Sequence, residues 1–101
     1  MSTIPLVVPK EFVKEFCERN HIRKFSLFGS VLTPRFRPDS DLDVLVEFDR
    51  GHVPGLVTLA GMEMELSEAS GHKVDLRTPD DLSRYFRSEV VSSALLQYER
   101  R

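Results

Sequence analysis

The sequence contains one cysteine, no tryptophan and no marked excess of either charge. Because Cys17 stands alone, no disulfide can form within the chain, which is typical of proteins that work in a reducing compartment. The 14 basic and 16 acidic residues give a formal net charge of −2, whereas proteins that bind nucleic acid mainly by neutralising phosphates are strongly basic. We therefore expect a cytoplasmic protein that makes no direct contact with nucleic acid.

Long apolar runs are also lacking. No stretch approaches the roughly 20 residues that an apolar helix needs to span a bilayer. The run Ile4–Val8 is short, contains Pro5 and has no basic leader, so we expect neither a membrane span nor a signal peptide. Hydrophobic residues make up 41% of the chain and charged residues 30%, which argues against general disorder. We expect residues 1–101 to form a single domain with one core.

Apolar residues recur at helical intervals in several segments. We expect Cys17, in the first of these, to be buried and unreactive, because no basic neighbour would lower the pKa of its thiol. Leu56 begins the apolar stripe of the second, and Gly71 ends that helix. Four helices and one short helical turn are predicted: from Pro9 to about Asn20, the turn Ser30–Leu32, Leu56–Ala69, one beginning at Pro79, and a final amphipathic helix over Arg87–Tyr98.

Three segments carry the pattern of buried strands: Ile22–Phe28, Leu42–Phe48 and Lys73–Leu76. The connection between the first two is short, which favours an antiparallel pair. A helical crossover joins the second to the third, and such crossovers usually connect parallel strands. The predicted fold class is therefore α/β (α+β): a small mixed β-sheet of about three strands, flanked by helices.

Polar residues of unusual spacing stand at the ends of these strands. Gly29-Ser30 closes the first strand, and Asp41-Leu42-Asp43 opens the second after ten intervening residues. Two aspartates at i and i+2 lie on the same face of a strand. Asp75 is likewise a carboxylate in an otherwise apolar strand, on the outward face of the third strand. In the predicted topology, all five residues converge on one point.

Three carboxylates around one point repel each other unless cations neutralise them. Mg²⁺ prefers oxygen ligands and is commonly held by one or two carboxylates together with substrate phosphates. A pair of Mg²⁺ ions would let Asp41, Asp43 and Asp75 serve as metal ligands in phosphoryl or nucleotidyl transfer, with Asp75 also able to accept a proton. Gly29 allows the backbone to approach closely, so Gly29 and Ser30 are candidates for holding nucleotide phosphates.

Taken separately, Gly29-Ser30 and Asp41-Leu42-Asp43 each have an ordinary structural interpretation as well. Aspartates before a strand often stabilise a loop, and Gly-Ser after a strand is a common turn. Two unpaired carboxylates in otherwise apolar strands are harder to explain without cations or arginine partners. A calcium loop beginning at Asp39 is excluded, because Val44 stands where glycine is needed and Arg50 where glutamate is needed. We expect surface or loop positions for the scattered histidines: His21, His52 and His72.

The motif residues resemble those of the minimal nucleotidyltransferase family, within the superfamily of DNA polymerase beta. The resemblance covers nearly the whole chain and is carried by four segments: Phe25–Leu32, Arg37–Phe48, His72–Leu76 and Ala94–Glu99. It implies a polymerase beta palm-like fold and an antitoxin that transfers AMP from ATP to a tyrosine of a HEPN-domain ribonuclease toxin. It also implies phosphate binding by Gly29 and Ser30, and binding of two Mg²⁺ ions and catalysis by Asp41, Asp43 and Asp75.

One departure from the family pattern is Thr33-Pro34, which stands where many relatives carry an arginine followed by glycine or aspartate. Arg35 or Arg37 can replace the missing arginine, or both can lie in a solvated linker. Two alternatives to the antitoxin enzyme stay open. One is a catalytically weak or inactive binding module that neutralises its partner by occlusion, with the final helix as an interface. The other is nucleotide transfer to a small molecule, although such enzymes usually carry a further domain.

Overall fold

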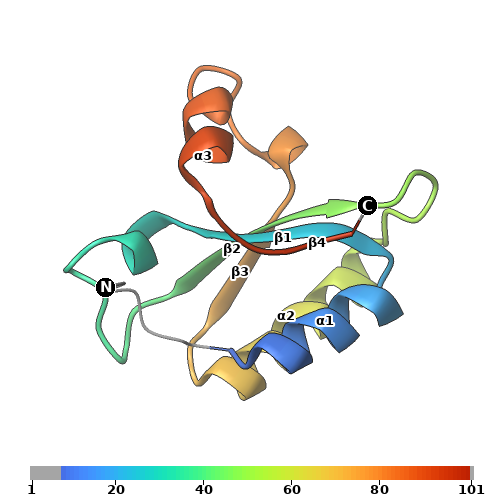
Figure 1. The fold of residues 1–101 in the computed structure, drawn as a ribbon, viewed down its shortest axis with the longest axis horizontal. Helices are drawn as coiled ribbons and strands as arrows, with labels where there is room; N and C mark the ends of the chain where they lie inside the picture. The colour runs from blue at the N-terminus through green and yellow to red at the C-terminus, as the bar shows by residue number, and fades with distance from the viewer. Residues whose placement is uncertain (1–7, 101) are drawn as a thin grey trace.

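The computed structural model describes residues 8–100 and builds them around one sheet with helices on both of its sides (Figure 1). Two short 3₁₀ turns, η1 and η2, follow β1 and β3. In chain order, the elements are α1 (Lys10–Arg19), β1 (Ile22–Phe28), η1 (Gly29–Leu32), β2 (Leu42–Phe48), α2 (Leu56–Ser70), β3 (Val74–Arg77), η2 (Pro79–Asp81), α3 (Arg87–Ser93) and β4 (Leu95–Glu99). The first two strands have the predicted bounds, and β3 is shifted by one residue.

The sheet has four strands in the order β3-β2-β1-β4. β1 pairs antiparallel with β2, and β2 pairs parallel with β3 across the α2 crossover, which confirms both predicted strand pairings. The mixed α/β fold is confirmed as well. The count of about three strands is one too low, because β4 pairs antiparallel with the other edge of β1.

The prediction of a final helix over Arg87–Tyr98 is wrong in its second half. The helix α3 ends at Ser93, and Leu95–Glu99 forms β4. Tyr98 is a register partner of Phe25 and packs against the core, so strand pairing with β1 outweighs the helical spacing of the apolar residues. The helix predicted to begin at Pro79 is likewise only a 3₁₀ turn, held by hydrogen bonds from Thr78 to the Asp81 carboxylate.

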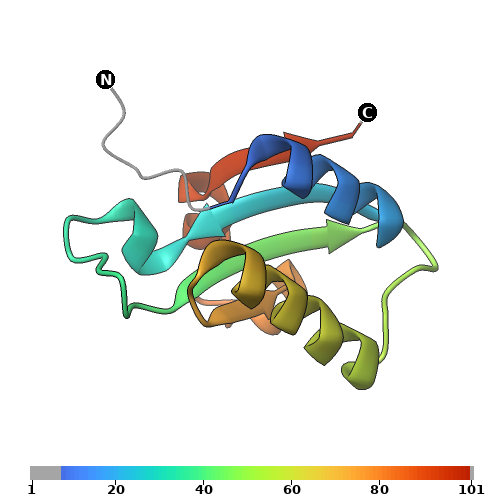
Figure 2. The ribbon, with the colours of Figure 1, turned by 90° about the horizontal axis from the view of Figure 1, so that it is seen from below.

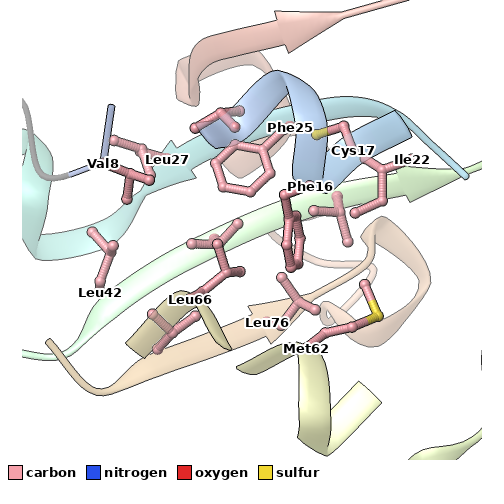
Figure 3. Packing of buried hydrophobic residues seen from close by; sticks show 14 of the residues in the cluster. Val8, Phe16, Cys17, Ile22, Phe25, Leu27, Leu42, Met62, Leu66 and Leu76 are labelled. Atoms are coloured by element: carbon pink, nitrogen blue, oxygen red, sulfur yellow. The ribbon is translucent and has the colours of Figure 1, made fainter. Parts of the chain in front are cut away.

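The core lies between one face of the sheet and the helices α1 and α2. Figure 2 shows these two helices in front of the strands, with α3 and η2 on the far side. Figure 3 shows how Phe16 and Cys17 of α1 and Met62 and Leu66 of α2 meet the strand residues. Cys17 is buried, as predicted, and burial raises the pKa of its thiol to about 12. Alternate residues of β2 also face this core: Leu42, Val44 and Val46.

The predicted apolar stripe of α2 is confirmed at Leu59, Met62 and Leu66 but is wrong at Leu56. Leu56 is 85% exposed, whereas Met62 and Leu66 are buried. With about 100° between successive residues, Leu56 lies roughly 120° around the helix axis from Met62, so the two cannot face the sheet together. Gly71 ends this helix in the left-handed conformation, with φ 75°, as predicted.

Within residues 8–100, no helix is both long and apolar enough to cross a bilayer. Of the apolar run Ile4–Val8, residues 4–7 lie outside the described part of the chain, and Val8 is buried in the core.

Candidate functional site

The candidate site lies on the face of the sheet that points away from α1 and α2. Strand alternation sets this orientation, because Leu42 and Val44 enter the core and the intervening Asp43 must project to the opposite face. The same argument applies to Asp75, which lies between the buried residues Val74 and Leu76. Both aspartates are half-buried.

Asp43 and Asp75 are direct register partners on the parallel strands β2 and β3. Neighbouring strands lie about 4.8 Å apart, so two side chains on the same face at the same register are immediate neighbours. Burial raises the pKa of the Asp43 carboxyl above its usual value, and the charges of Asp75 and Asp41 raise it further. The structure therefore brings two of the three predicted carboxylates together.

Asp41 is placed differently from the other two. It is exposed and precedes the first residue of β2. Its charge is close enough to raise the pKa of Asp43. Even so, no set of three histidine, cysteine, aspartate or glutamate side chains in the described part of the chain is arranged to hold one metal ion. The predicted convergence of three carboxylates is thus a close pair with Asp41 at its edge.

Gly29 lies directly against Asp43. It follows β1 with φ 76°, a left-handed conformation that favours glycine, and Phe28 before it is the register partner of Asp43. A Cβ atom at Gly29 would overlap Oδ2 of Asp43 and lie 3.1 Å from its Cγ. The absence of a side chain at this position leaves the space that the Asp43 carboxylate occupies.

Ser30 lies in η1, directly after this glycine. Its carbonyl oxygen accepts two hydrogen bonds from Thr33, one from the backbone N–H at 2.9 Å and one from the hydroxyl at 2.8 Å. The Thr33 hydroxyl also accepts the N–H of Arg35 at 3.2 Å. Thr33, noted in the sequence only as a departure from the family pattern, therefore fixes the turn that contains Gly29 and Ser30.

Arg77 is a site residue that the sequence analysis missed. Its Nε and Nη2 donate to Oδ2 of Asp75 at 3.3 and 3.1 Å. Both side chains are nearly half exposed, so solvent screens this pair. The positive charge also partly offsets the raised pKa of Asp43. Spacing of i and i+2 on β3 places Arg77 on the same face as Asp75, and this alternation is the signal that would have revealed it.

Comparison with known proteins agrees with this arrangement. The sequence pattern of the nucleotidyltransferase domain family matches residues 9–97. The chain belongs to this family. Its similarity to a solved structure provisionally assigned as a minimal nucleotidyltransferase has a TM-score of 0.70 and 32% identity, and covers 85% of this chain and 86% of that one. The resemblance read from the motifs is thereby confirmed, and with it the expectation of a nucleotidyltransferase enzyme.

One further protein is similar in sequence, and one further solved structure is similar in fold. The protein adenylyltransferase MntA of Thermococcus cleftensis is 36% identical over 63 residues, which make up 62% of each protein. A complex of a tri-AMPylated Shewanella oneidensis HEPN toxin with its MNT antitoxin shares the fold of this nucleotidyltransferase at a TM-score of 0.60. That match has 18% identity and covers 90% of this chain and 70% of the other.

The residues of this nucleotidyltransferase fit a divalent cation. Two adjacent carboxylates supply the hard oxygen ligands that Mg²⁺ prefers, and Mg²⁺ needs only one or two protein carboxylates beside phosphates and water. The raised pKa of Asp43 reflects a cost of ionisation that a cation would remove. Asp43 and Asp75 are therefore the first candidates for metal ligands, with Asp41 beside them.

Proposed function

We propose that this nucleotidyltransferase is a protein adenylyltransferase antitoxin, which transfers AMP from ATP to a tyrosine hydroxyl of a HEPN-domain toxin. The observation that carries the proposal is the register pair of Asp43 and Asp75 against the turn at Gly29. Support for the donor and the acceptor comes from relatives, one named as a protein adenylyltransferase and another in complex with an AMP-modified HEPN toxin. We place the activity in a single domain, residues 1–101, that works in the cytoplasm.

Each site residue has a distinct role in this proposal. Asp41, Asp43 and Asp75 would hold two Mg²⁺ ions, while Ser30 and the backbone at Gly29 would bind the nucleotide phosphates. When bound, the ions would lower the pKa of the acceptor hydroxyl and stabilise charge on the leaving pyrophosphate. Glycine at position 29 suits this role because any side chain there would meet the Asp43 carboxylate.

The transfer step is a displacement at the α-phosphorus of ATP. The tyrosine oxygen forms a bond to this phosphorus as the bond to the bridging oxygen of the β-phosphate breaks, and pyrophosphate leaves with the electron pair. Asp75 accepts the hydroxyl proton, directly or through water, and releases it to solvent. The Asp75 side chain is 40% exposed, so water can reach it.

A protein acceptor fits the shape of the site better than a small molecule does. The carboxylates lie on a sheet face that the described residues cover only with η2 and α3, and α3 contains no buried residue. A partner protein would supply the missing wall around the acceptor hydroxyl and exclude water from it.

The proposal is tested by incubating the purified protein and its HEPN partner with Mg²⁺ and ATP labelled at the α-phosphate. We expect label on the partner, and we expect the double variant Asp41→Asn with Asp43→Asn to lose it. Asp39→Asn is the matched control for Asp41→Asn, because each removes one carboxylate charge from the same exposed loop and Asp39 lies outside the site. No transfer by the wild type, or equal transfer by the double variant, would refute the proposed adenylyltransferase activity.

A neutralisation assay with the same double variant tests the occlusion alternative. A binding module that blocks its partner would still neutralise it after the double substitution. Part of the sequence support for this alternative, a final amphipathic helix as the interface, is gone, because β4 pairs with β1 and Tyr98 packs against the core.

A further inference from the structure

The loop that leads to Asp41 is fastened to the segment before β3. Within the loop, the N–H of Ser40 donates to the carbonyl of Arg37 at 3.0 Å, and the N–H of Arg37 donates to the Ser40 hydroxyl at 2.9 Å. These two bonds close a compact turn over residues 37–40. The turn is tied to the rest of the protein by His72, the residue that follows Gly71.

The imidazole of His72 makes this connection. Its Nδ1 lies 2.9 Å from the carbonyl oxygen of Ser40, and since a carbonyl oxygen only accepts hydrogen bonds, Nδ1 must carry the proton. The imidazole also contacts the ring of Phe36, with centroids 4.6 Å apart, and Phe36 packs against the hydrophobic core. The Ser70 hydroxyl accepts the backbone N–H of His72 at 3.2 Å. The ring is thus held from its backbone and from one face.

A second bond fastens the other side of Asp41. The N–H of Leu42 donates to the carbonyl of Lys73 at 2.8 Å. Asp41 therefore lies between two residues whose backbones are bonded to His72 and Lys73, and Lys73 precedes Asp75 by two positions. The two hydrogen bonds set where Asp41 stands relative to the strand that carries Asp75.

We propose that His72 is a positioning residue, which fixes the backbone of Asp41 so that its carboxylate can join Asp43 and Asp75 in holding the metal ions that would bind the nucleotide. This inference rests on the proposed function for the role of Asp41. Asp41 needs such support more than its neighbours do, because it stands outside the regular ladder of β2, whereas Asp43 is fixed by strand pairing on both sides. The histidine first expected to be an ordinary loop residue then acts on the site through Ser40.

Two substitutions separate the hydrogen bond from the packing of the ring. His72→Phe keeps an aromatic ring against Phe36 and removes the donor. His72→Asn loses the ring but places an amide N–H where Nδ1 stands. His52→Phe is the matched control: His52 is exposed, stacks on His21 with centroids 3.9 Å apart, and lies in the loop after β2.

The measured quantity is the dissociation constant for a nonhydrolysable ATP analogue in the presence of Mg²⁺, by calorimetry, with thermal melting as the check of folding. We expect His72→Phe to weaken binding by about five- to tenfold, the effect of losing one hydrogen bond. We expect His72→Asn to bind within about twofold of wild type, and His52→Phe to bind unchanged. A purely structural role for the ring would give the opposite order, with Asn weaker than Phe.

Amide hydrogen exchange supplies a readout that does not depend on ligand. In His72→Phe, the Leu42 amide should exchange several-fold faster than in wild type, while the core amide of Val46 should be unchanged. Binding and Leu42 exchange in His72→Phe that both equal wild type would overturn the positioning role. Wild-type protein that binds no nucleotide would instead overturn the proposed function. Faster Leu42 exchange in His72→Phe would then still show that the hydrogen bond from His72 to Ser40 holds the loop before Asp41 in place.

Discussion

Replacing Gly29 by alanine should cost more stability than the same change at Gly51, although both glycines have left-handed backbones. Their φ angles are 76° and 80°. Alanine in that conformation costs about 1–2 kcal/mol. At Gly51, no atom beyond the two neighbouring residues lies within 4 Å of the added carbon, so this strain is the whole cost. At Gly29, the added carbon overlaps Oδ2 of Asp43, and the carboxylate must leave its rotamer at a further cost of about 0.5–1.5 kcal/mol.

Thermal melting of the metal-free protein measures the difference. For a chain of this size, 1 kcal/mol corresponds to about 4–8 °C, so Gly29→Ala should melt several degrees below Gly51→Ala. Because the displaced carboxylate is a candidate metal ligand, Gly29→Ala should also lose Mg²⁺-dependent nucleotide binding, and Gly51→Ala should keep it.

A double-mutant cycle identifies the cause. In an Asp43→Ala background the overlap no longer exists, so Gly29→Ala should then cost only the backbone strain seen at Gly51. The expected coupling between the two positions is about 1 kcal/mol. Equal melting temperatures for Gly29→Ala and Gly51→Ala, or no coupling with Asp43, would refute the idea that position 29 must be free of a side chain to accommodate that carboxylate.

Three further predictions follow from burial and charge. Because its pKa is raised in the folded state, Asp43 lowers stability as pH rises through that pKa, so Asp43→Asn should melt higher than metal-free wild type at neutral pH. This gain should vanish below the usual carboxyl pKa of 3.8, and a lower melting temperature at neutral pH would contradict it. Cys17, with a thiol pKa of about 12, should resist alkylation at neutral pH until urea unfolds the chain, as mass spectrometry would show. Leu66→Ala should cost about 2–5 kcal/mol in urea denaturation and Leu56→Ala within about 0.5 kcal/mol, whereas equal losses would contradict the observed orientation of α2.

The strands that hold the site were predictable because their sequence signals are local. Leu42–Phe48 alternates apolar residues with Asp43 and Glu47, and this period of two fixed both the strand and the face on which Asp43 lies. The short connection before it and the helical crossover after it also determined the directions of strand pairing. The family was identified because the segments that contain Gly29-Ser30 and Asp41-Leu42-Asp43 resemble the pattern of the minimal nucleotidyltransferases.

The end of the chain was not predictable in the same way. Leu95 and Tyr98 are three residues apart, which suits one face of a helix. They form a strand because β1 has an open edge beside them, and that edge exists only once the sheet has formed. The exposure of Leu56 has a similar origin: the apolar spacing of α2 is compatible with more than one buried face, and packing against the sheet selects the one with Met62 and Leu66.

The sequence by itself therefore determined which residues can do chemistry and which strands carry them, because these depend on residue type and short-range periodicity. The predicted topology already brought these residues together, and only the tertiary structure decided their arrangement: Asp43 beside Asp75, Gly29 against the Asp43 carboxylate, and Asp41 at the edge, tied through Ser40 to His72. Ser40 and His72 are separated by 32 positions. A contact between residues so far apart leaves no periodic mark on the chain, because it arises only when the crossover helix brings β3 alongside β2.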